Sequence, residues 1–431
     1  MTFRPVAEIR DPVHGYVKMT EVERELIDSP FIQRLRRVHQ LAGSYLVYPG
    51  AVHTRFEHAI GAMHVAGQVA ESIAPTASID PDQVQQVRIA GLLHDVGHGP
   101  FSHMYEEVLA YKGNVVHEDI SQRIILETSI GDILGKNGFS PKKMSDFAVG
   151  RQTGYPPFMN EIIAGGLSAD MMDYLVRDSY FTGVEYGKVD TQRVIDSLRV
   201  ADGHLVIEEA ALNAFEALLL ARYEMFKAVY FHRTVRAAEL MLVHSMRLAD
   251  EVLGLTDISD LDRYMELTDE IVLQNLATLD PSTPELKEAR RLALDFRNRR
   301  LVKCVFERLF QRKNVVVGKI FANERVRERV TSDLARTAKV DPMHIYLDVP
   351  TTPSIPYTSS RQALTSIKLV RTSGKKRIVK SVPISELPLV GSIAGYMDVL
   401  RVYTTPENRR AVEAATTAMF KDKGLVPAPS L

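Results

Sequence analysis

The segment Gly91-Leu92-Leu93-His94-Asp95-Val96-Gly97-His98-Gly99-Pro100-Phe101-Ser102-His103 decides how this chain is interpreted. Three histidines and an aspartate fall within ten positions at the end of an apolar helical stretch. Burying so many titratable side chains without partners would cost on the order of several kcal/mol, so they need a functional reason. Neutral imidazole and carboxylate together suit one divalent transition metal, with Mn, Fe, Zn, Co and Ni all acceptable. We therefore expect part of a metal site here, completed by other elements.

Candidates for the missing ligands stand on both sides of this segment. Upstream, Arg55-Phe56-Glu57-His58 places His58 36 residues before His94. Downstream, Asp170 follows 75 residues after Asp95, in a helical stretch. A single His-Asp pair occurs by chance in many chains, but these elements in this order, each in a helical setting, are a strong signal.

The composition is typical of a globular chain with two or three domains: 431 residues, 45% hydrophobic and 25% charged. The net charge of −1 neither supports nor excludes nucleic acid as a partner. Cys304 is the single cysteine, which excludes an intramolecular disulfide and favours a reducing compartment. The chain starts without an apolar signal segment, and its most apolar long stretch, residues 210–231, is interrupted by charges. We expect a cytoplasmic protein with no membrane partner.

The pattern of apolar residues predicts a mainly α fold with two parts. Helical spacing predicts helices over residues 84–94, 116–126, 170–180 and 210–250, and a last one over 406–419. β-rich sequence predicts strands at residues 315–317, 345–349 and 366–382, the last as a hairpin turning at Ser373-Gly374. We expect a helical domain over residues 1–280, followed by a smaller α+β lobe over residues 281–431.

The predicted C-terminal lobe is basic. Residues 281–340 hold 16 Lys and Arg against 7 Asp and Glu, and residues 361–380 hold 7 basic residues and no acidic one. A solvated surface is the ordinary explanation of such a run. The alternative is a site for polyanions, either nucleotide phosphates or nucleic acid, and position in the sequence does not choose between them.

The order His … His-Asp … Asp is similar to the signature of the HD phosphohydrolase superfamily. Further stretches resemble the deoxynucleoside triphosphate (dNTP) triphosphohydrolases of that superfamily, in particular the catalytic core of the branch that combines SAM and HD domains, without the SAM domain. The stretches are residues 10–15 (RDPVHG), 27–30 (IDSP), 33–36 (QRLR), 40–41 (QL), 49–51 (PGA), 55–58 (RFEH) and 91–103. The likeness extends from about residue 7 to residues 401–403 (RVY).

The resemblance implies a role for each matching position. It implies one metal ion held by His58, His94, Asp95 and Asp170. It implies catalytic groups at His98, His103, Glu106 and His117. It implies phosphate contacts from Arg55, Arg193 and Arg222, a sugar pocket of Gln40, Leu41, Tyr174, Asp178 and Tyr230, and a further pocket position at His232. Tyr230 would stack on the ribose and exclude a 2′-hydroxyl group.

Each of these residues also has an ordinary structural interpretation, as a hydrogen-bonded core histidine, a core aromatic or a surface ion pair. Taken singly, the structural interpretation is favoured; taken with the four metal positions in order, the functional one is. His14, His39, His53 and His64 are interpreted as structural. One departure matters: the family has a phosphate-contacting lysine directly after the last metal aspartate, and here that position is Met171.

Three functions follow as hypotheses. The first is metal-dependent hydrolysis of dNTPs to deoxynucleoside and inorganic triphosphate, with magnesium accompanying the triphosphate as an option. The second keeps the HD phosphohydrolase class but removes single phosphates from nucleotides or other phosphoesters, as the change at Met171 would permit. The third, from another class, is a nucleic-acid-binding protein with a vestigial HD site and a basic lobe.

The resemblance also implies a homo-oligomer, a dimer or tetramer, with GTP or dGTP as an allosteric activator bound between subunits. The residues that match the activator site are Asp28, Gln33, Arg36, Arg299 and Lys303. The aspartate carboxylate can accept from the two N–H donors on the guanine edge, which adenine lacks. The ordinary alternative is that these arginines belong to solvated helix faces.

Overall fold

The computed structural model describes residues 4–113, 115–312, 320–321, 323–353, 365–373, 376–393 and 395–420. Helices predominate among them, which confirms the mainly α expectation. The chain divides into two compact units: unit 1 is Met1–Met225, Leu255–Leu273 and Ile355–Ser392, and unit 2 is Phe226–Gly254, Gln274–Ser354 and Ile393–Leu431. The predicted division at residue 280 is a single cut, whereas in this division the chain passes between the units several times.

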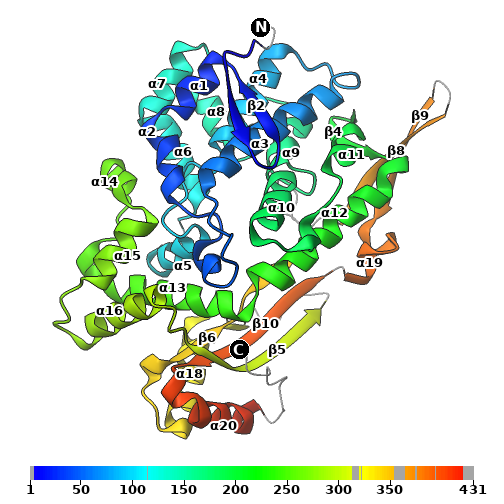
Figure 1. Cartoon of the computed structure of the whole chain (residues 1–431). Helices are drawn as coiled ribbons and strands as arrows, with labels where there is room; N and C mark the ends of the chain where they lie inside the picture. Colours follow the sequence, from blue (N-terminus) through cyan, green and yellow to red (C-terminus); the bar gives the residue numbers. More distant parts are fainter. Residues whose placement is uncertain are drawn as a thin grey trace. The chain divides into compact units, whose positions relative to one another are not determined.

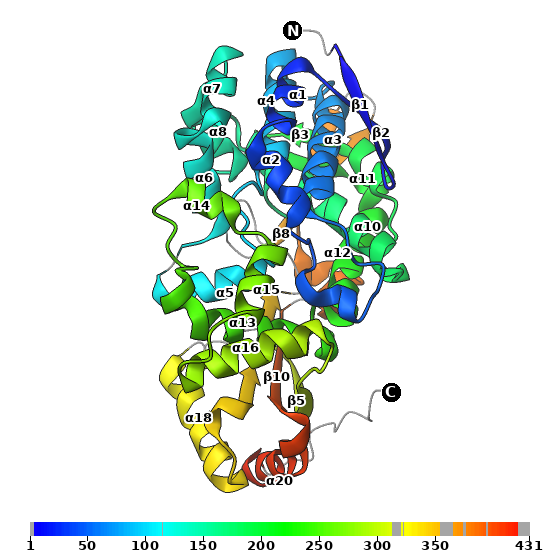
Figure 2. The same ribbon diagram turned by 60° about the vertical axis from the view of Figure 1, so that its left-hand side comes forward.

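Unit 1 is built mainly from short and medium helices. They are α1 (Glu21–Ile27), α2 (Pro30–Arg34), α3 (Arg55–Ile73), α4 (Pro81–Leu93), α5 (His103–Lys112), α6 (His117–Glu127), α7 (Ser129–Lys136), α8 (Pro141–Ala148), α9 (Pro157–Ile163), α10 (Ala169–Thr182), α11 (Thr191–Asp196), α12 (Leu212–Met225) and α14 (Leu261–Glu266). Helix α15 (Asp269–Ala277) begins in unit 1 and ends in unit 2. Helices α6, α7 and α8 pack together, as Figure 2 shows.

Helix α3 lies at the centre of unit 1, packed against α4, α9 and α10 (Figure 1). Its sequence is rich in alanine and glycine, so neighbouring helices approach it closely on most sides. Its start is fixed by a capping box in which Thr54 and Glu57 exchange hydrogen bonds with each other's backbone. Helix α4 starts with Asp80 as N-cap and a proline directly after it. These caps fix where α3 and α4 begin.

Unit 1 also contains two small sheets. Strands β1 (Ala7–Asp11) and β2 (Gly15–Met19) form an antiparallel hairpin. The second sheet has the order β3 (Leu198–Ala201), β4 (His204–Glu208), β8 (Ser366–Ser373) and β9 (Lys376–Pro383). The β8–β9 pair confirms the predicted antiparallel hairpin, with Ser366 opposite Pro383, although residues 374–375 of the predicted turn lie outside the described residues. Strand β4 pairs with β8 in parallel, so the unit includes sequence from the predicted C-terminal lobe.

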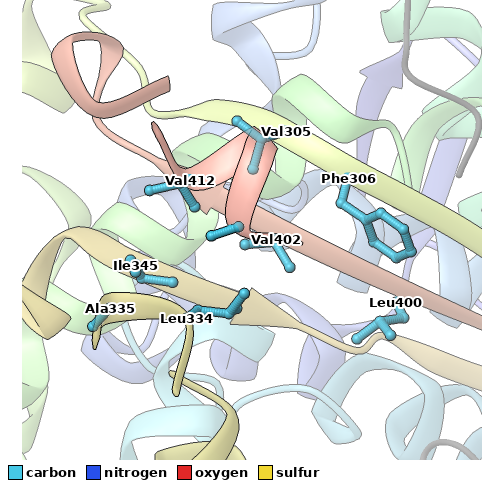
Figure 3. Close-up of a cluster of buried hydrophobic side chains, with 9 residues drawn as sticks. Val305, Phe306, Leu334, Ala335, Ile345, Leu400, Val402 and Val412 are labelled. Atoms are coloured by element: carbon cyan, nitrogen blue, oxygen red, sulfur yellow. The ribbon is translucent and has the colours of Figure 1, made fainter. Parts of the chain in front are cut away.

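Unit 2 is an antiparallel sheet with helices. The central strand β10 (Tyr396–Thr404) pairs with β5 (Lys303–Arg312) on one side and with β6 (Ile345–Asp348) and β7 (Thr351–Pro353) on the other. Its helices are α13 (Arg233–Leu253), α16 (Pro284–Arg297), α18 (Glu324–Ala338) and α20 (Arg409–Phe420). Figure 3 shows its apolar core, which includes Val402 and Leu400 of β10, Leu334 of α18 and Val412 of α20.

The helices predicted over 84–94, 116–126 and 170–180 are α4, α6 and α10. The long helix predicted over 210–250 is interrupted, because a π-helical turn at Phe226–Tyr230 separates α12 from α13. The strand predicted at 315–317 lies outside the described residues. Among the described helices, none is both long and apolar enough to cross a membrane.

Candidate functional site

The four predicted metal ligands come together in unit 1. His58 lies in the first turn of α3, His94 caps the end of α4, Asp95 follows it, and Asp170 lies in the first turn of α10. The Nε2 atom of His58 is 3.2 Å from Nε2 of His94, 3.2 Å from a carboxylate oxygen of Asp170 and 3.5 Å from one of Asp95. Three helices thus aim four ligand atoms at one point.

The hydrogen bonds behind the two rings show that this point is suited to a cation. The Nδ1 atom of His94 lies 2.8 Å from the carbonyl oxygen of Gly91, which only accepts, so this nitrogen carries the proton. The Nδ1 atom of His58 lies 2.8 Å from the carboxylate of Asp173 and carries a proton for the same reason. Neutral rings therefore present two Nε2 lone pairs beside two carboxylates, which is the donor set that a divalent transition metal binds.

When no cation is bound, the neighbouring carboxylates favour the protonated form of His58. Burial lowers the pKa of His58, but the hydrogen bonds to Asp170 and Asp173 outweigh it and raise the pKa to about 10. The pKa of Asp95 is held well below its usual range, against its burial, by its neighbours His94 and Arg55. The site thus holds its aspartates ionised, as ligands of a metal must be.

A second cluster of ligand-type side chains adjoins the first. His98, His103, Glu106 and His117 lie close enough together to share one ion or one reacting group. Glu106 accepts from Nδ1 of both His103 and His117, and the ring of His117 stacks on that of His98 with centroids 3.9 Å apart. The Nε2 atoms of His98 and His117 lie 3.4 and 3.8 Å from Asp95. All four predicted catalytic residues are therefore grouped beside the metal ligands.

The backbone between the two clusters is strained. Phe101 and Ser102 both have positive φ angles, 58° and 54°, immediately before α5 begins at His103. Such a conformation costs on the order of 1–3 kcal/mol per residue and is concentrated at functional sites. It is held by fixed contacts, including the backbone N–H of Phe101, which donates to Asp269 at 2.7 Å. The turn directs His103 outward, where its side chain is 61% exposed.

Arg55 is buried and bound to the metal site. Its guanidinium donates to the carboxylate of Asp95 and, at 2.9 Å, to the hydroxyl of Ser102. A surface ion pair with Glu57, the ordinary structural interpretation of Arg55, does not form, because Arg55 is only 3% exposed and Glu57 accepts from Thr54. Arg55 places a positive charge next to the metal ligands.

Several predicted substrate residues lie in the same unit. Tyr174 of α10 hydrogen-bonds Arg222 of α12, and burial raises the pKa of this tyrosine to about 12. Asp178 is buried and lies 2.8 Å from Nε2 of His53. Between η1 (Leu35–Arg37) and η2 (Ala42–Leu46), Gln40 is buried and Leu41 is half-buried. Arg193 is exposed on α11. The substrate contacts of these residues stay predictions.

The other predicted positions are divided between the units. Tyr230 ends the π-helical turn in unit 2, and His232 is the N-cap of α13. Asp28, Gln33 and Arg36 belong to unit 1, where Arg36 donates to Gln33 at 2.9 Å, whereas Arg299 and Lys303 belong to unit 2. Their roles in the sugar pocket and activator site stay predictions.

Comparison with protein families identifies this arrangement. Residues 55–143 match the model of the HD domain, and residues 189–423, more than half of the chain, match the model of the HD associated region. The chain belongs to the HD-domain family that carries this associated region. The HD-domain match contains His58, the His94-Asp95 pair and the second cluster, while Asp170 lies between the two matches.

The chain is also similar to individual proteins. The chain is 36% identical over 247 residues to the uncharacterized protein YwfO of Bacillus subtilis, covering 56% of each. It is 32% identical over 313 residues to a protein of Dictyostelium discoideum named deoxynucleoside triphosphate triphosphohydrolase SAMHD1 homolog, covering 69% of this chain and 60% of the relative. A crystal structure of a phosphohydrolase from Bacteroides thetaiotaomicron superimposes with a TM-score of 0.72 at 25% identity, covering 92% of this chain and 99% of that one. The chain thus spans less than two thirds of these curated relatives.

The groups that lie behind the candidate HD ligands were not predicted from the sequence. Asp173 binds His58, Arg177 and His14, although His14 was expected to be only structural. The spacing of Asp170, Asp173 and Arg177 by three and four residues was the available signal, because it places all three on one face of a helix. Their partners in α3 and in the β1–β2 turn are distant in sequence, so the sequence pattern does not show them.

Proposed function

We propose that this HD-domain chain hydrolyses dNTPs in a metal-dependent reaction and releases a deoxynucleoside and inorganic triphosphate. The observation that carries the proposal is the convergence of two histidine lone pairs and two carboxylates directly beside the His117–Glu106 pair. The substrate class is supported by the likeness to the relative from Dictyostelium discoideum, which is named for that activity. The Bacteroides structure, titled a phosphohydrolase, supports the broader reaction class.

The four ligands would hold one divalent transition ion: His58, His94, Asp95 and Asp170. When bound, such an ion polarises a phosphoryl oxygen and lowers the pKa of a water molecule. Around it, Arg55 keeps Asp95 fixed and ionised, and adds a positive charge that can face the triphosphate. Magnesium would accompany the triphosphate as a counterion.

The His117–Glu106 pair is suited to donate the proton that the leaving 5′-oxygen of the nucleoside needs. Burial lowers the pKa of His117, but the hydrogen bond from Nδ1 to Glu106 outweighs it and raises the pKa above the ordinary value. The raised pKa favours the protonated ring, whose Nε2 lies on the side that faces Asp95. A positioned acid of this kind contributes about 10²- to 10⁴-fold to rate.

The substrate would be positioned by the residues that the family resemblance assigns. Arg222, together with Arg55 and Arg193, would bind phosphates, and Tyr174, Asp178 and Tyr230 would surround the sugar. A homo-oligomer activated by a guanine nucleotide belongs to the same proposal, with Asp28 as the guanine-recognising carboxylate.

Product analysis tests the proposal. Protein loaded separately with Mn²⁺, Fe²⁺, Zn²⁺, Co²⁺ or Ni²⁺ is incubated with each dNTP and each NTP, and the products are resolved by chromatography. We expect deoxynucleoside and triphosphate. Stepwise diphosphate and monophosphate would instead support an HD phosphohydrolase that removes single phosphates. No turnover with any metal, together with retention of nucleic acid, would support a binding protein with a vestigial site.

A further inference from the structure

One buried carboxylate stands directly behind the metal ligand His58. Both oxygens of Asp173 in α10 are fully used: one lies 2.8 Å from Nδ1 of His58 and 2.9 Å from Nε of Arg177. The other lies 2.6 Å from Nε2 of His14 and 2.9 Å from Nη2 of Arg177. Four donors thus meet the four lone-pair directions that a carboxylate offers, and the side chains of Asp173 and Arg177 are completely buried.

The same network extends to the turn between β1 and β2. Arg177 donates from Nη1 to Asp11 at 2.8 Å, and the other carboxylate oxygen of Asp11 accepts from the backbone N–H groups of Val13 and His14 at 2.9 and 2.8 Å. Asp11 therefore shapes the turn that presents His14 to Asp173. This hairpin, far from the metal ligands in the sequence, is joined to His58 through two charged side chains.

A glycine in α3 leaves the space that this network needs. Gly61 lies one turn after His58, and a Cβ atom at this position would come within 1.9 Å of the Asp173 carboxylate and 2.4 Å of Nη2 of Arg177. Both distances are far below van der Waals contact, so any larger residue would displace the pair. The close approach of α10 to α3 thus depends on glycine at the place where Asp173 reaches His58.

We propose that Asp173 is a positioning residue for the metal centre and that the β1–β2 turn, through His14 and Asp11, holds it in place. By accepting from Nδ1, Asp173 fixes the His58 tautomer and ring orientation that aim Nε2 at the metal. His14 and Arg177 prevent the carboxylate from rotating away. The inference rests on the proposed metal centre, and it assigns to the N-terminal hairpin a role in metal affinity.

The test measures metal affinity, by competition with a chelator, in purified full-length protein loaded with Co²⁺. Asp173→Asn and Gly61→Ala should each weaken Co²⁺ binding about 10- to 100-fold and shift the visible spectrum of the bound ion. His14→Ala should weaken binding in the same direction, whereas His14→Gln, which keeps a donor, should restore most of the affinity. The melting temperature of each metal-free variant is recorded alongside.

Glu23→Gln is the matched control. Glu23 is also completely buried, and it accepts from the backbone of Thr20, from Gln85 and twice from Arg88, at 2.6–2.9 Å. None of these donors is a metal ligand, so this variant should lose stability while it keeps wild-type Co²⁺ affinity.

The outcomes separate this inference from the proposed function. Wild-type protein that binds no Co²⁺ would contradict the metal centre itself. Wild-type binding with unchanged affinity in Asp173→Asn, or an equal loss in Glu23→Gln, would overturn the positioning role and leave the metal centre standing. If Asp173→Asn does not fold, the comparison of His14→Ala with His14→Gln decides, and equal affinities in that pair would overturn the inference.

Discussion

The Nε2 atoms of His58 and His94 lie 3.2 Å apart. In the neutral rings the proton is on Nδ1, so each Nε2 atom carries an unshared lone pair. Two lone pairs at this distance repel each other, and the carboxylates of Asp95 and Asp170 beside them add to the repulsion. A proton relieves part of this repulsion in the metal-free protein, and a divalent ion relieves it fully. The arrangement is therefore costly unless it binds a cation, which is why it carries the functional argument.

Mutation of His117 should reduce turnover without reducing metal binding, unlike mutation of a metal ligand. In His117→Ala, turnover of dNTPs should fall about 10²- to 10⁴-fold, because the proton donor is lost, while the metal content per chain stays at the wild-type value. Steady-state rates and plasma mass spectrometry on the same samples check this. Loss of metal together with rate would instead make His117 a ligand.

Tyr230 should set the preference for deoxynucleotides. Replacing it by alanine removes the ring proposed to exclude a 2′-hydroxyl, so the ratio of kcat/KM for dATP to that for ATP should fall toward one. Tyr186→Ala, at a tyrosine that is 55% exposed in unit 1, is the control and should keep the wild-type ratio. An unchanged ratio in Tyr230→Ala would remove this residue from the sugar pocket.

His64 should make folding stability fall in mild acid. Burial, followed by the charges of His14 and Arg88, lowers the pKa of His64 to about 4 in the folded protein, against 6.5 ordinarily. Between these values the unfolded chain binds a proton that the folded chain does not, so the free energy of unfolding decreases as pH falls from about 6.5 to about 4. Urea titrations at pH 7 and pH 4.5 should show a smaller difference for His64→Gln than for wild type. An equal difference would contradict the assignment.

The activator prediction depends on Asp28. GTP or dGTP should raise both the sedimentation coefficient and the rate with another dNTP, because phosphates between Arg36 and the partner subunit's Arg299 would join subunits otherwise separated by like charge. Asp28→Ala should abolish both responses. If neither guanine nucleotide changes mass or rate in wild type, the matching residues have no activator function here.

The four candidate metal ligands could be selected from the sequence because three of them sit at helix ends or in first turns with clear signals. The apolar spacing over residues 84–94 located α4, and with it His94. The strands β1 and β2, each five residues long, were not predicted from the sequence. The interruption of the 210–250 helix is a local π turn within an otherwise helical sequence. Such features depend on tertiary packing rather than on periodicity.

The residues that surround the candidate ligands could not be predicted from the sequence, because they also depend on tertiary packing. Asp173 and His14 are 159 residues apart, and their contact exists only because α10, α3 and the first hairpin pack together. Gly61 gave no signal, because a glycine within an alanine-rich helix is explained equally well by ordinary close packing. Only the distances around Asp173 show what that glycine makes room for.

His58, His94, Asp95 and Asp170 are proposed to hold one metal ion on which hydrolysis depends, and metal counting is the decisive test. Protein is stripped with a chelator, reloaded with Mn²⁺ or Fe²⁺, and its metal content is measured by plasma mass spectrometry alongside dNTP turnover. Wild-type protein should regain one ion per chain and its activity together, and Asp95→Ala should regain neither while remaining helical by circular dichroism. Full turnover by the stripped protein, or one bound ion and a normal rate in Asp95→Ala, would contradict the claim.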